Sequence, residues 1–208
     1  MSSNVPVVYI VEDDMSFRTS IDRLLRASGF ETISYERAEE FLNEPALRRP
    51  ACLLLDVQLP TMDGLELQKM LTARGISLPI VFMTGHGSIQ MGVQAIKRGA
   101  ADFLPKPFDT AELEAAILAA IARDTETLGR EGEVEEALSL IASLTPRENE
   151  VLRWVISGKL NKQIAFALGT TEKTVKVHRA HVMQKTGVAS VADLVRLAER
   201  CGIAPAGA

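Results

Sequence analysis

The chain has 208 residues, of which 47% are hydrophobic and 24% are charged, and its formal net charge is −4. This composition is ordinary for globular domains, and the length is enough for one or two of them. Without an apolar run of about 18 residues, a basic signal-peptide segment or enough cysteines for a disulfide framework, the sequence predicts a cytoplasmic protein with no membrane contact.

Polar side chains follow a series of short apolar runs. Glu12 and Asp13 follow the first run, and Asp56 follows the second. Thr84 follows the third run, and Lys106 follows the fourth after one proline. Apolar runs without alternation indicate buried parallel strands, whose carboxyl ends form one ligand-binding edge, so we expect these side chains to converge there. The runs are residues 7–11, 52–55, 80–83 and 101–104.

Carboxylates, a hydroxyl and an amine at one edge favour a site for a hard cation and an anion. Mg²⁺ prefers oxygen ligands, and the mutual repulsion of clustered carboxylates makes a cation favourable. An aspartate can also attack phosphorus, while the metal, amine and hydroxyl bind the phosphoryl oxygens. Taken singly, an acidic pair is more often part of a loop and a lysine is more often solvated. The prediction of a cation and anion site therefore depends on finding all of these residues together, each after an apolar run.

Residues 5–122 resemble the receiver domain of a two-component response regulator. The resemblance implies a flavodoxin-like, doubly wound α/β fold with a parallel five-stranded sheet in the order 2-1-3-4-5. It also implies a cis Lys106-Pro107 bond. The stretches that carry the resemblance are 11–14, 55–60 with Asp63-Gly64, 84–87 and 103–108.

By this resemblance, Asp56 accepts a phosphoryl group from a sensor histidine kinase, which docks on Phe17 and Ile21. Thr84 and Lys106 bind phosphoryl oxygens, and Phe103 is the aromatic switch residue. Phosphorylation is expected to produce a homodimer. The implied Mg²⁺ ligands are the side chains of Glu12, Asp13 and Asp56 and the backbone carbonyl of Gln58. The expected dimer patch is Ile89, Val93, Gln94, Lys97, Arg98 and Asp102.

Charge divides the chain into three parts. Residues 1–123 carry a net charge of −4, residues 124–143 carry −5 and residues 144–208 carry +5. We expect a receiver domain, an acidic helical linker and a second domain with these boundaries. A positive excess on a small domain is compatible with nucleic-acid binding. The linker could be solvated or could pack on a partner chain or on the next domain through Val134, Leu138 and Ile141.

Capping residues predict a small all-α domain in the last part of the chain. Thr145, Pro146 and Glu148 form the pattern of a capping box, in a helix that ends near Gly158. Glu148 is expected to pair with an arginine. Two helices joined at Gly169, the second of them basic, are typical of a helix-turn-helix. The following helices are expected at 162–168, 172–187 and 191–200, capped by Asn161, Thr171 and Ser190. The apolar contacts between the paired helices are expected from Ile164, Ala165, Leu168, Val175, Val182 and Met183.

The basic helix 172–187 could enter a DNA major groove, although such helices are more often only solvated. Residues 144–152, 161–169 and 174–188 resemble the LuxR-type helix-turn-helix, and the whole chain resembles the FixJ/NarL class. The resemblance implies promoter DNA and RNA polymerase as partners. His178 and His181, an i,i+3 pair on a basic helix with no carboxylate beside them, do not indicate a metal site. The implied base-facing residues are Lys176, Val177, Arg179 and Ala180, and the implied phosphate contacts are Lys173, Thr174 and His178.

The sequence therefore predicts a response regulator, not an enzyme. Phosphorylation of Asp56 with Mg²⁺ is expected to switch dimerisation and sequence-specific DNA binding, and activation of transcription is the commoner role. A phosphohydrolase is disfavoured because Gln58 stands where such enzymes place a second aspartate as general acid. A regulator with a vestigial receiver, which binds DNA without phosphorylation, remains the alternative.

Overall fold

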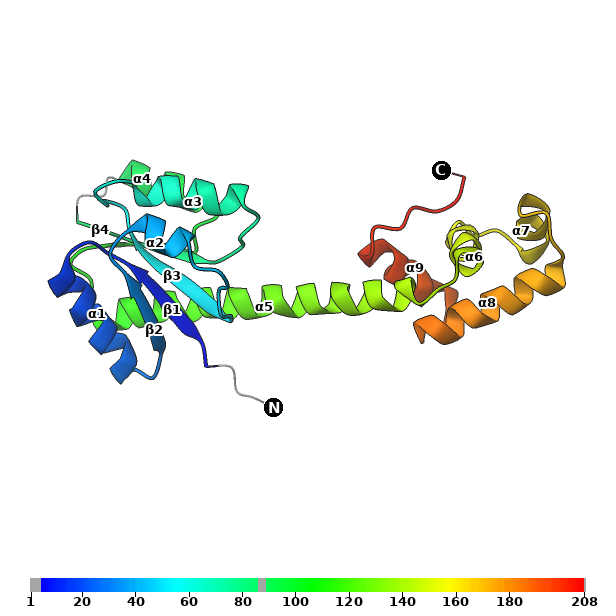
Figure 1. Cartoon of the computed structure of the whole chain (residues 1–208), viewed down its shortest axis with the longest axis horizontal. Helices are drawn as coiled ribbons and strands as arrows, with labels where there is room; N and C mark the ends of the chain where they lie inside the picture. The colour runs from blue at the N-terminus through cyan, green and yellow to red at the C-terminus, as the bar shows by residue number, and fades with distance from the viewer. Residues whose placement is uncertain (1–4, 86–88, 208) are drawn as a thin grey trace. The chain divides into compact units, whose positions relative to one another are not determined.

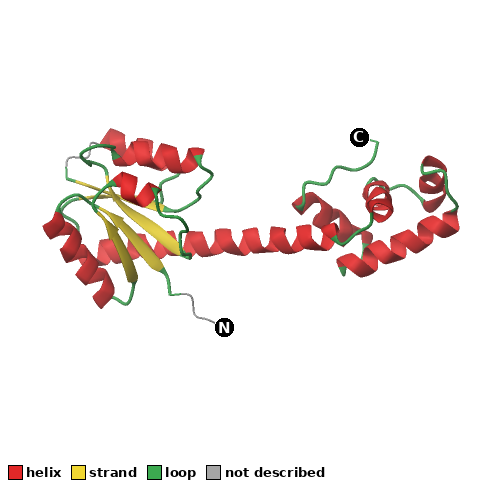
Figure 2. Ribbon diagram, viewed as in Figure 1, coloured by secondary structure: helices red, strands yellow, loops and turns green. Residues whose placement is uncertain are grey.

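The computed structural model describes residues 5–85 and 89–207. Its amino-terminal part contains a parallel five-stranded sheet in the predicted order β2-β1-β3-β4-β5 (Figures 1 and 2). The four apolar runs form all its strands except β2. This strand lies at the edge of the sheet and buries only Thr32, so its sequence lacks the continuous apolar run that indicates a buried strand. The strands are β1 (Val7–Val11), β2 (Glu31–Tyr35), β3 (Ala51–Asp56), β4 (Ile80–Thr84) and β5 (Asp102–Pro105).

Helices cover both faces of the sheet (Figure 1). Val8 and Ile10 of β1 pack toward the layer formed by α1 and the first part of α5. Tyr9 and Val11 pack toward the layer formed by α2, α3 and α4. Burial on both faces explains why β1 is apolar at every position instead of alternating. The helices are α1 (Met15–Ala27), α2 (Ala38–Leu42), α3 (Gly64–Ala73), α4 (Ile89–Lys97) and α5 (Thr110–Ala142).

Helix α5 continues through the segment expected to be the linker. The chain divides into two compact units within this helix, after Leu128, which is later than the boundary at 123 expected from charge. Among the described helices, none combines the length and apolar character needed to cross a membrane.

A buried ion pair attaches α5 to the start of β3. Asp124 is fully buried, and its carboxylate accepts hydrogen bonds from Arg49 Nε at 3.1 Å and from the backbone N–H of Ala51 at 2.8 Å. The sequence placed Asp124 in the acidic linker by charge. In the structure this carboxylate pairs with Arg49 inside the first unit.

The second unit is helical. Thr145 and Glu148 form the predicted capping box at the start of its first helix. Gly169, in the predicted turn, has a φ of +61°, which glycine adopts without strain. Ile141 at the end of α5 is buried in this unit's core, whereas Leu138 is exposed. The helices are α6 (Pro146–Ile156), α7 (Asn161–Ala167), α8 (Glu172–Thr186) and α9 (Val191–Arg200).

One predicted cap is wrong. Asn161 is the first residue of α7, and Leu160 occupies the capping position. The Leu160 N–H donates to the side chain of Gln163 at 2.9 Å. The Asn161 side chain instead accepts a hydrogen bond from Arg179 of α8 at 3.2 Å.

Replacing Arg49 by Ala is expected to lower the free energy of unfolding by about 3–5 kcal/mol, because it leaves the buried Asp124 carboxylate without its ion-pair partner. The neighbouring Arg48→Ala is the control. Arg48 pairs with Glu31, both side chains are more than 40% exposed, and the expected loss is at most about 1 kcal/mol. Urea unfolding of the two variants measures the difference. Equal losses would contradict a clamping role for Arg49.

Candidate phosphoacceptor site and DNA-facing helix

The carboxyl edge of the sheet brings the predicted site residues together. Lys106 Nζ lies 2.6 Å from Asp56 Oδ2 and 2.7 Å from Glu12 Oε2. Glu12 and Asp56 are buried, and Asp13 beside them is exposed. The lysine follows β5, and the two buried carboxylates come from the ends of β1 and β3, so parallel alignment of the strands creates this contact.

The acidic residues fit a hard cation. Glu12, Asp13 and Asp56 can each offer one oxygen within 4.8 Å of the others. Mg²⁺ takes oxygen ligands and keeps several of its waters. Because Asp13 is exposed, the group is open to solvent on one side and could accommodate those waters. The Gln58 backbone carbonyl stays a predicted ligand. The Gln58 N–H donates to Asp56 Oδ1 at 2.9 Å, which orients that carboxylate.

Burial and charge change the ionisation of this site. Burial raises the pKa of Glu12 to about 7; the hydrogen bond from Lys106 opposes the rise and the Asp56 carboxylate adds to it. Burial disfavours the charged form of Lys106, but its hydrogen bonds to Asp56 and Glu12 outweigh that effect and raise the pKa of Lys106. The site therefore holds carboxylates close together, and binding a cation or a proton would lower the repulsion between them.

The first turn of α1 supports the site in ways that sequence reasoning missed. The Asp14 side chain caps this helix by accepting from the N–H groups of Ser16 and Phe17, at 2.8 and 3.0 Å. The Phe17 ring lies under the lysine, with Lys106 Nζ 4.1 Å from the ring centroid. Arg18 donates to the backbone carbonyls of Glu12 and Asp13. No spacing rule links Phe17 to Lys106, because this contact forms only when the first turn of α1 and the loop after β5 meet at the carboxyl edge of the sheet.

Gly64 is required by a close backbone approach. A Cβ atom at this position would collide with the backbone carbonyl of Asp56, and the Gly64 N–H donates to the carbonyl of Val57 at 2.9 Å. The start of α3 therefore packs directly against the backbone at the end of β3. This contact gives a physical reason for the glycine in the Asp63-Gly64 pair.

The two predicted switch residues lie on neighbouring strands. Thr84 is buried at the end of β4, and its backbone carbonyl accepts from the Lys106 N–H at 2.7 Å. Phe103 is half-buried, with its ring centroid 6.4 Å from that of Phe82. Gly92 of α4 leaves room for this ring, since a Cβ there would lie 3.2 Å from it. The Lys106-Pro107 bond is cis, as predicted.

The predicted dimer patch is only partly described. Val93, Gln94 and Lys97 are exposed on α4, Arg98 is exposed directly after it, and Asp102 is half-buried. The side chain of Ile89 lies outside the described residues, as do His86 and Gly87 of the stretch after β4.

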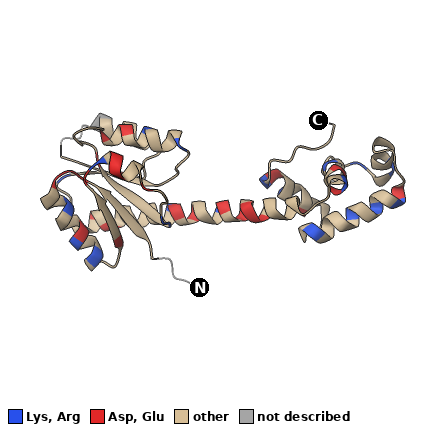
Figure 3. Ribbon diagram, in the orientation of Figure 1, with Lys and Arg blue, Asp and Glu red and all other residues tan. Residues whose placement is uncertain are grey.

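A basic face runs along α8 (Figure 3). The side chains of Thr174, His178 and Arg179 are half-buried, and Arg179 is held by Asn161 as described above. Most of the residues predicted to contact DNA are therefore exposed to solvent, and one of them, Arg179, is held by a hydrogen bond. The exposed members are Lys173, Lys176, Val177 and Ala180.

The expected arginine partner of Glu148 is a misassignment. Glu148 Oε2 lies 2.6 Å from Lys185 Nζ, and Oε1 lies 3.4 Å from His181 Nδ1. The hydrogen bond from Lys185, with that from the Thr145 N–H, lowers the pKa of Glu148 to about 2. Both partners come from α8, two helices further along the chain, so the helix pattern could not identify them.

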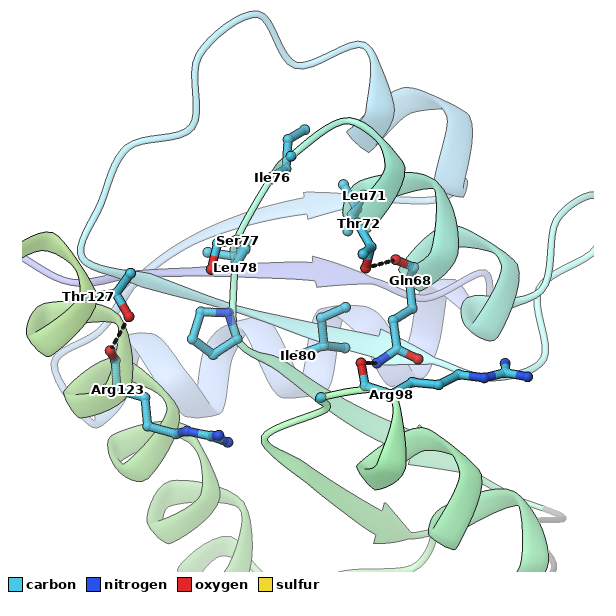
Figure 4. Close-up of a pocket in the computed structure, with 13 residues that line it drawn as sticks. Gln68, Leu71, Thr72, Ile76, Ser77, Leu78, Ile80, Arg98, Arg123 and Thr127 are labelled. Carbon is cyan, nitrogen blue, oxygen red and sulfur yellow. Dashed lines mark hydrogen bonds between the residues drawn. The ribbon is translucent and has the colours of Figure 1, made fainter. Parts of the chain in front are cut away.

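A pocket of about 370 Å³ lies at the opposite end of the sheet, near the start of β4 (Figure 4). Gln68, Arg98 and Arg123 line it together with the chain before β4. Figure 4 shows Arg98 and Arg123 extending without converging on each other. The pocket therefore lacks the grouped charges found at the carboxyl edge.

Comparisons with known proteins place both parts of the chain in families. Residues 8–118 match the response regulator receiver domain, and residues 142–198 match the luxR family of bacterial regulatory proteins. Nodulation protein W of Bradyrhizobium diazoefficiens is 44% identical over 97% of this chain and 89% of its own length. The transcriptional regulatory protein FixJ of Azorhizobium caulinodans is 41% identical over 99% of this chain and 97% of its own length.

Solved structures agree with these matches. The structure of the response regulator StyR has a TM-score of 0.82 and 45% identity, over 94% of this chain and 99% of that one. Full-length FixJ from B. japonicum has a TM-score of 0.57 and 38% identity, over 94% of this chain and 97% of that one.

Replacing Lys106 by Met is expected to lower the free energy of unfolding in EDTA by about 2 kcal/mol. The loss stays below the usual range for breaking a buried ion pair because Glu12 can take up a proton. Mg²⁺ should then raise the unfolding midpoint more in the variant than in the wild type, since it replaces the lost positive charge. Thermal unfolding with EDTA and with Mg²⁺ measures this difference. Lys69→Met, at an exposed position of α3, is the control, and an equal Mg²⁺ effect in all three proteins would disprove the neutralising role.

Proposed function

The chain belongs to the FixJ-like response regulators, which join a receiver domain to a LuxR-type DNA-binding domain, and from this premise we propose that phosphorylation of Asp56 controls its binding to promoter DNA. The observation that carries the proposal is the contact of Asp56 with Lys106 at 2.6 Å beside the Glu12 and Asp13 carboxylates. A buried aspartate next to an ammonium and further acidic groups is suited to hold a phosphoryl group and a cation together.

In the proposed reaction, a carboxylate oxygen of Asp56 attacks the phosphorus of a phosphohistidine on a sensor kinase. The P–N bond breaks, an aspartyl P–O bond forms, and the imidazole of the kinase leaves. Lys106 then binds a phosphoryl oxygen in place of the Asp56 carboxylate oxygen that it contacts now. Glu12, Asp13, Asp56 and the Gln58 carbonyl would hold Mg²⁺, which supplies positive charge to the transferred group.

The new phosphoryl group would act on Thr84 and Phe103. A hydroxyl at the end of β4 can donate to a phosphoryl oxygen, and its inward movement would let the Phe103 ring follow. Phe103 packs beside Gly92 of α4, so its movement would alter the face on which the predicted dimer patch lies. Turning such a switch from mostly off to mostly on requires roughly 5 kcal/mol of differential stabilisation, to which a homodimer interface would contribute.

The output is proposed to lie on α8. Lys176, Val177, Arg179 and Ala180 would read base edges in the major groove, and the hydrogen bond from Arg179 to Asn161 would orient one of these side chains beforehand. Lys173, Thr174 and His178 would contact phosphates. RNA polymerase is the further proposed partner. The proposed functional division keeps the receiver at 1–123, the linker at 124–143 and the DNA-binding domain at 144–208, whereas the boundary between the two compact units lies within the linker, after Leu128.

Incubation with acetyl phosphate and Mg²⁺ tests the phosphoacceptor. Wild type is expected to gain the mass of one phosphoryl group, and Asp56→Ala is expected to gain none, because the nucleophile is missing. Glu135→Ala, at an exposed position of α5, is the control and should react like wild type. Modification of Asp56→Ala would refute the assignment. Equal promoter affinity of the phosphorylated and unphosphorylated protein in a gel shift would favour the vestigial-receiver alternative.

Replacing Lys176 by Ala is expected to weaken binding to a specific promoter site by about 1–3 kcal/mol and to relax the preference at one base pair. Arg200→Ala serves as the control, because Arg200 lies on α9 and pairs with Glu133 at 3.7 Å. Fluorescence anisotropy on the promoter site and on single-base variants measures both effects. An unchanged base preference in Lys176→Ala would remove Lys176 from the base-reading set.

A further inference from the structure

Three side chains that could bind a transition metal meet between α6 and α8. Glu148, His178 and His181 can each offer one ligand atom within 4.8 Å of the others. Glu148 is buried, His178 is half-buried and His181 is exposed, so the group has an opening to solvent. The helix pattern alone does not predict this site, because α8 carries no carboxylate between the two histidines. The fold supplies the carboxylate from α6.

Two polar atoms of these three side chains lack a full set of hydrogen-bond partners. Glu148 Oε2 is occupied by Lys185 Nζ at 2.6 Å and by the Thr145 N–H at 2.8 Å, but Oε1 is left facing His181 Nδ1 at 3.4 Å. Among the described residues, His178 Nδ1 is buried and has no hydrogen-bond partner. Buried polar atoms are nearly always paired with protein, water or an ion, so this nitrogen is open to a partner that the described residues do not supply.

We propose that Glu148, His178 and His181 form a binding site for a divalent transition-metal ion, with Zn²⁺ as the reference ion. Two imidazole nitrogens and one carboxylate oxygen suit Zn²⁺, Ni²⁺ or Cu²⁺ and do not suit Mg²⁺. Three protein ligands also leave a fourth position for water. Ligand atoms around tetrahedral Zn²⁺ lie about 3.4 Å apart, given bond lengths near 2.1 Å, so the group must contract slightly, and the exposed His181 can move to allow it.

The proposed ion would act on the DNA-binding unit. It would join α6 to α8 and replace the long Glu148–His181 contact by metal bonds. Coordination through Nδ1 of His178 would fix the ring and leave its Nε2–H as a donor, which is compatible with the proposed phosphate contact. Lys185 holds the other oxygen of Glu148 and places a second positive charge nearby, so we expect moderate affinity and reversible binding. The site is distinct from the carboxylates at the receiver edge and does not depend on phosphorylation of Asp56.

Titration of the full-length protein with Co²⁺ and then Zn²⁺, in millimolar Mg²⁺ to occupy the receiver carboxylates, tests the proposal. One Co²⁺ per chain is expected to give the visible absorption of a nitrogen-containing, low-coordinate site, and Zn²⁺ is expected to remove that absorption. His181→Ala should weaken binding at least about tenfold, because a direct ligand is lost. His181 is exposed, so this variant should fold normally, and its unfolding midpoint without metal is measured as a check.

Matched controls separate this site from other sources of binding. His86 is the remaining histidine of the chain, and His86→Ala should bind as wild type does. Asp13→Ala should remove Mg²⁺ binding at the receiver edge and leave the Co²⁺ absorption unchanged. Absence of Co²⁺ binding, equal binding by His181→Ala, or loss of binding in Asp13→Ala would each overturn the proposal. None of these outcomes affects the acetyl phosphate test of Asp56, so the two proposals fail independently.

Discussion

The bridge that Lys106 forms between Asp56 and Glu12 is the interaction on which the receiver site depends. Its ammonium joins carboxylates 50 and 94 residues away in the chain. Such a contact exists only if β1, β3 and β5 are parallel and end at the same edge. In return, the lysine stabilises the ionised forms of two carboxylates that are buried side by side; without it, one of them would have to take up a proton or bind a cation. The site thus depends on the fold, and the lysine lowers the cost of burying the site.

The surroundings of this bridge link it to the rest of the first unit. The cap of α1 and the Phe17 ring support it from one side, and Gly64 lets α3 approach Asp56 from the other. The Lys106 N–H also holds the backbone of Thr84. A change in charge at Asp56 would therefore act on β4 and β5 directly. Phe103 lies on the second of these strands, against α4, and is well placed to pass such a change to the surface.

In the second unit, the same principle applies to polar contacts between helices. Asn161 of α7 holds Arg179, and Glu148 of α6 holds Lys185, so α8 is fixed by polar contacts as well as by its apolar face. Helices of this length are only marginally stable alone, and their packing determines their conformation. The orientation of the side chains proposed to face DNA therefore depends on the packing of the whole unit. A metal ion between Glu148 and the two histidines would strengthen one of these connections.

The sequence by itself determined the features that depend on local order. Continuous apolar runs predicted β1, β3, β4 and β5, the residues after them predicted the site, and Thr145 with Glu148 predicted a capping box. The edge strand β2, with one buried side chain, was too polar to be identified in this way. Only the tertiary structure decided that Asp124 pairs with Arg49, that Asn161 holds Arg179 rather than capping α7, and that Glu148 meets Lys185 and His181. Period and capping rules describe neighbours within one element, whereas these partners come from different elements and meet only when the elements pack.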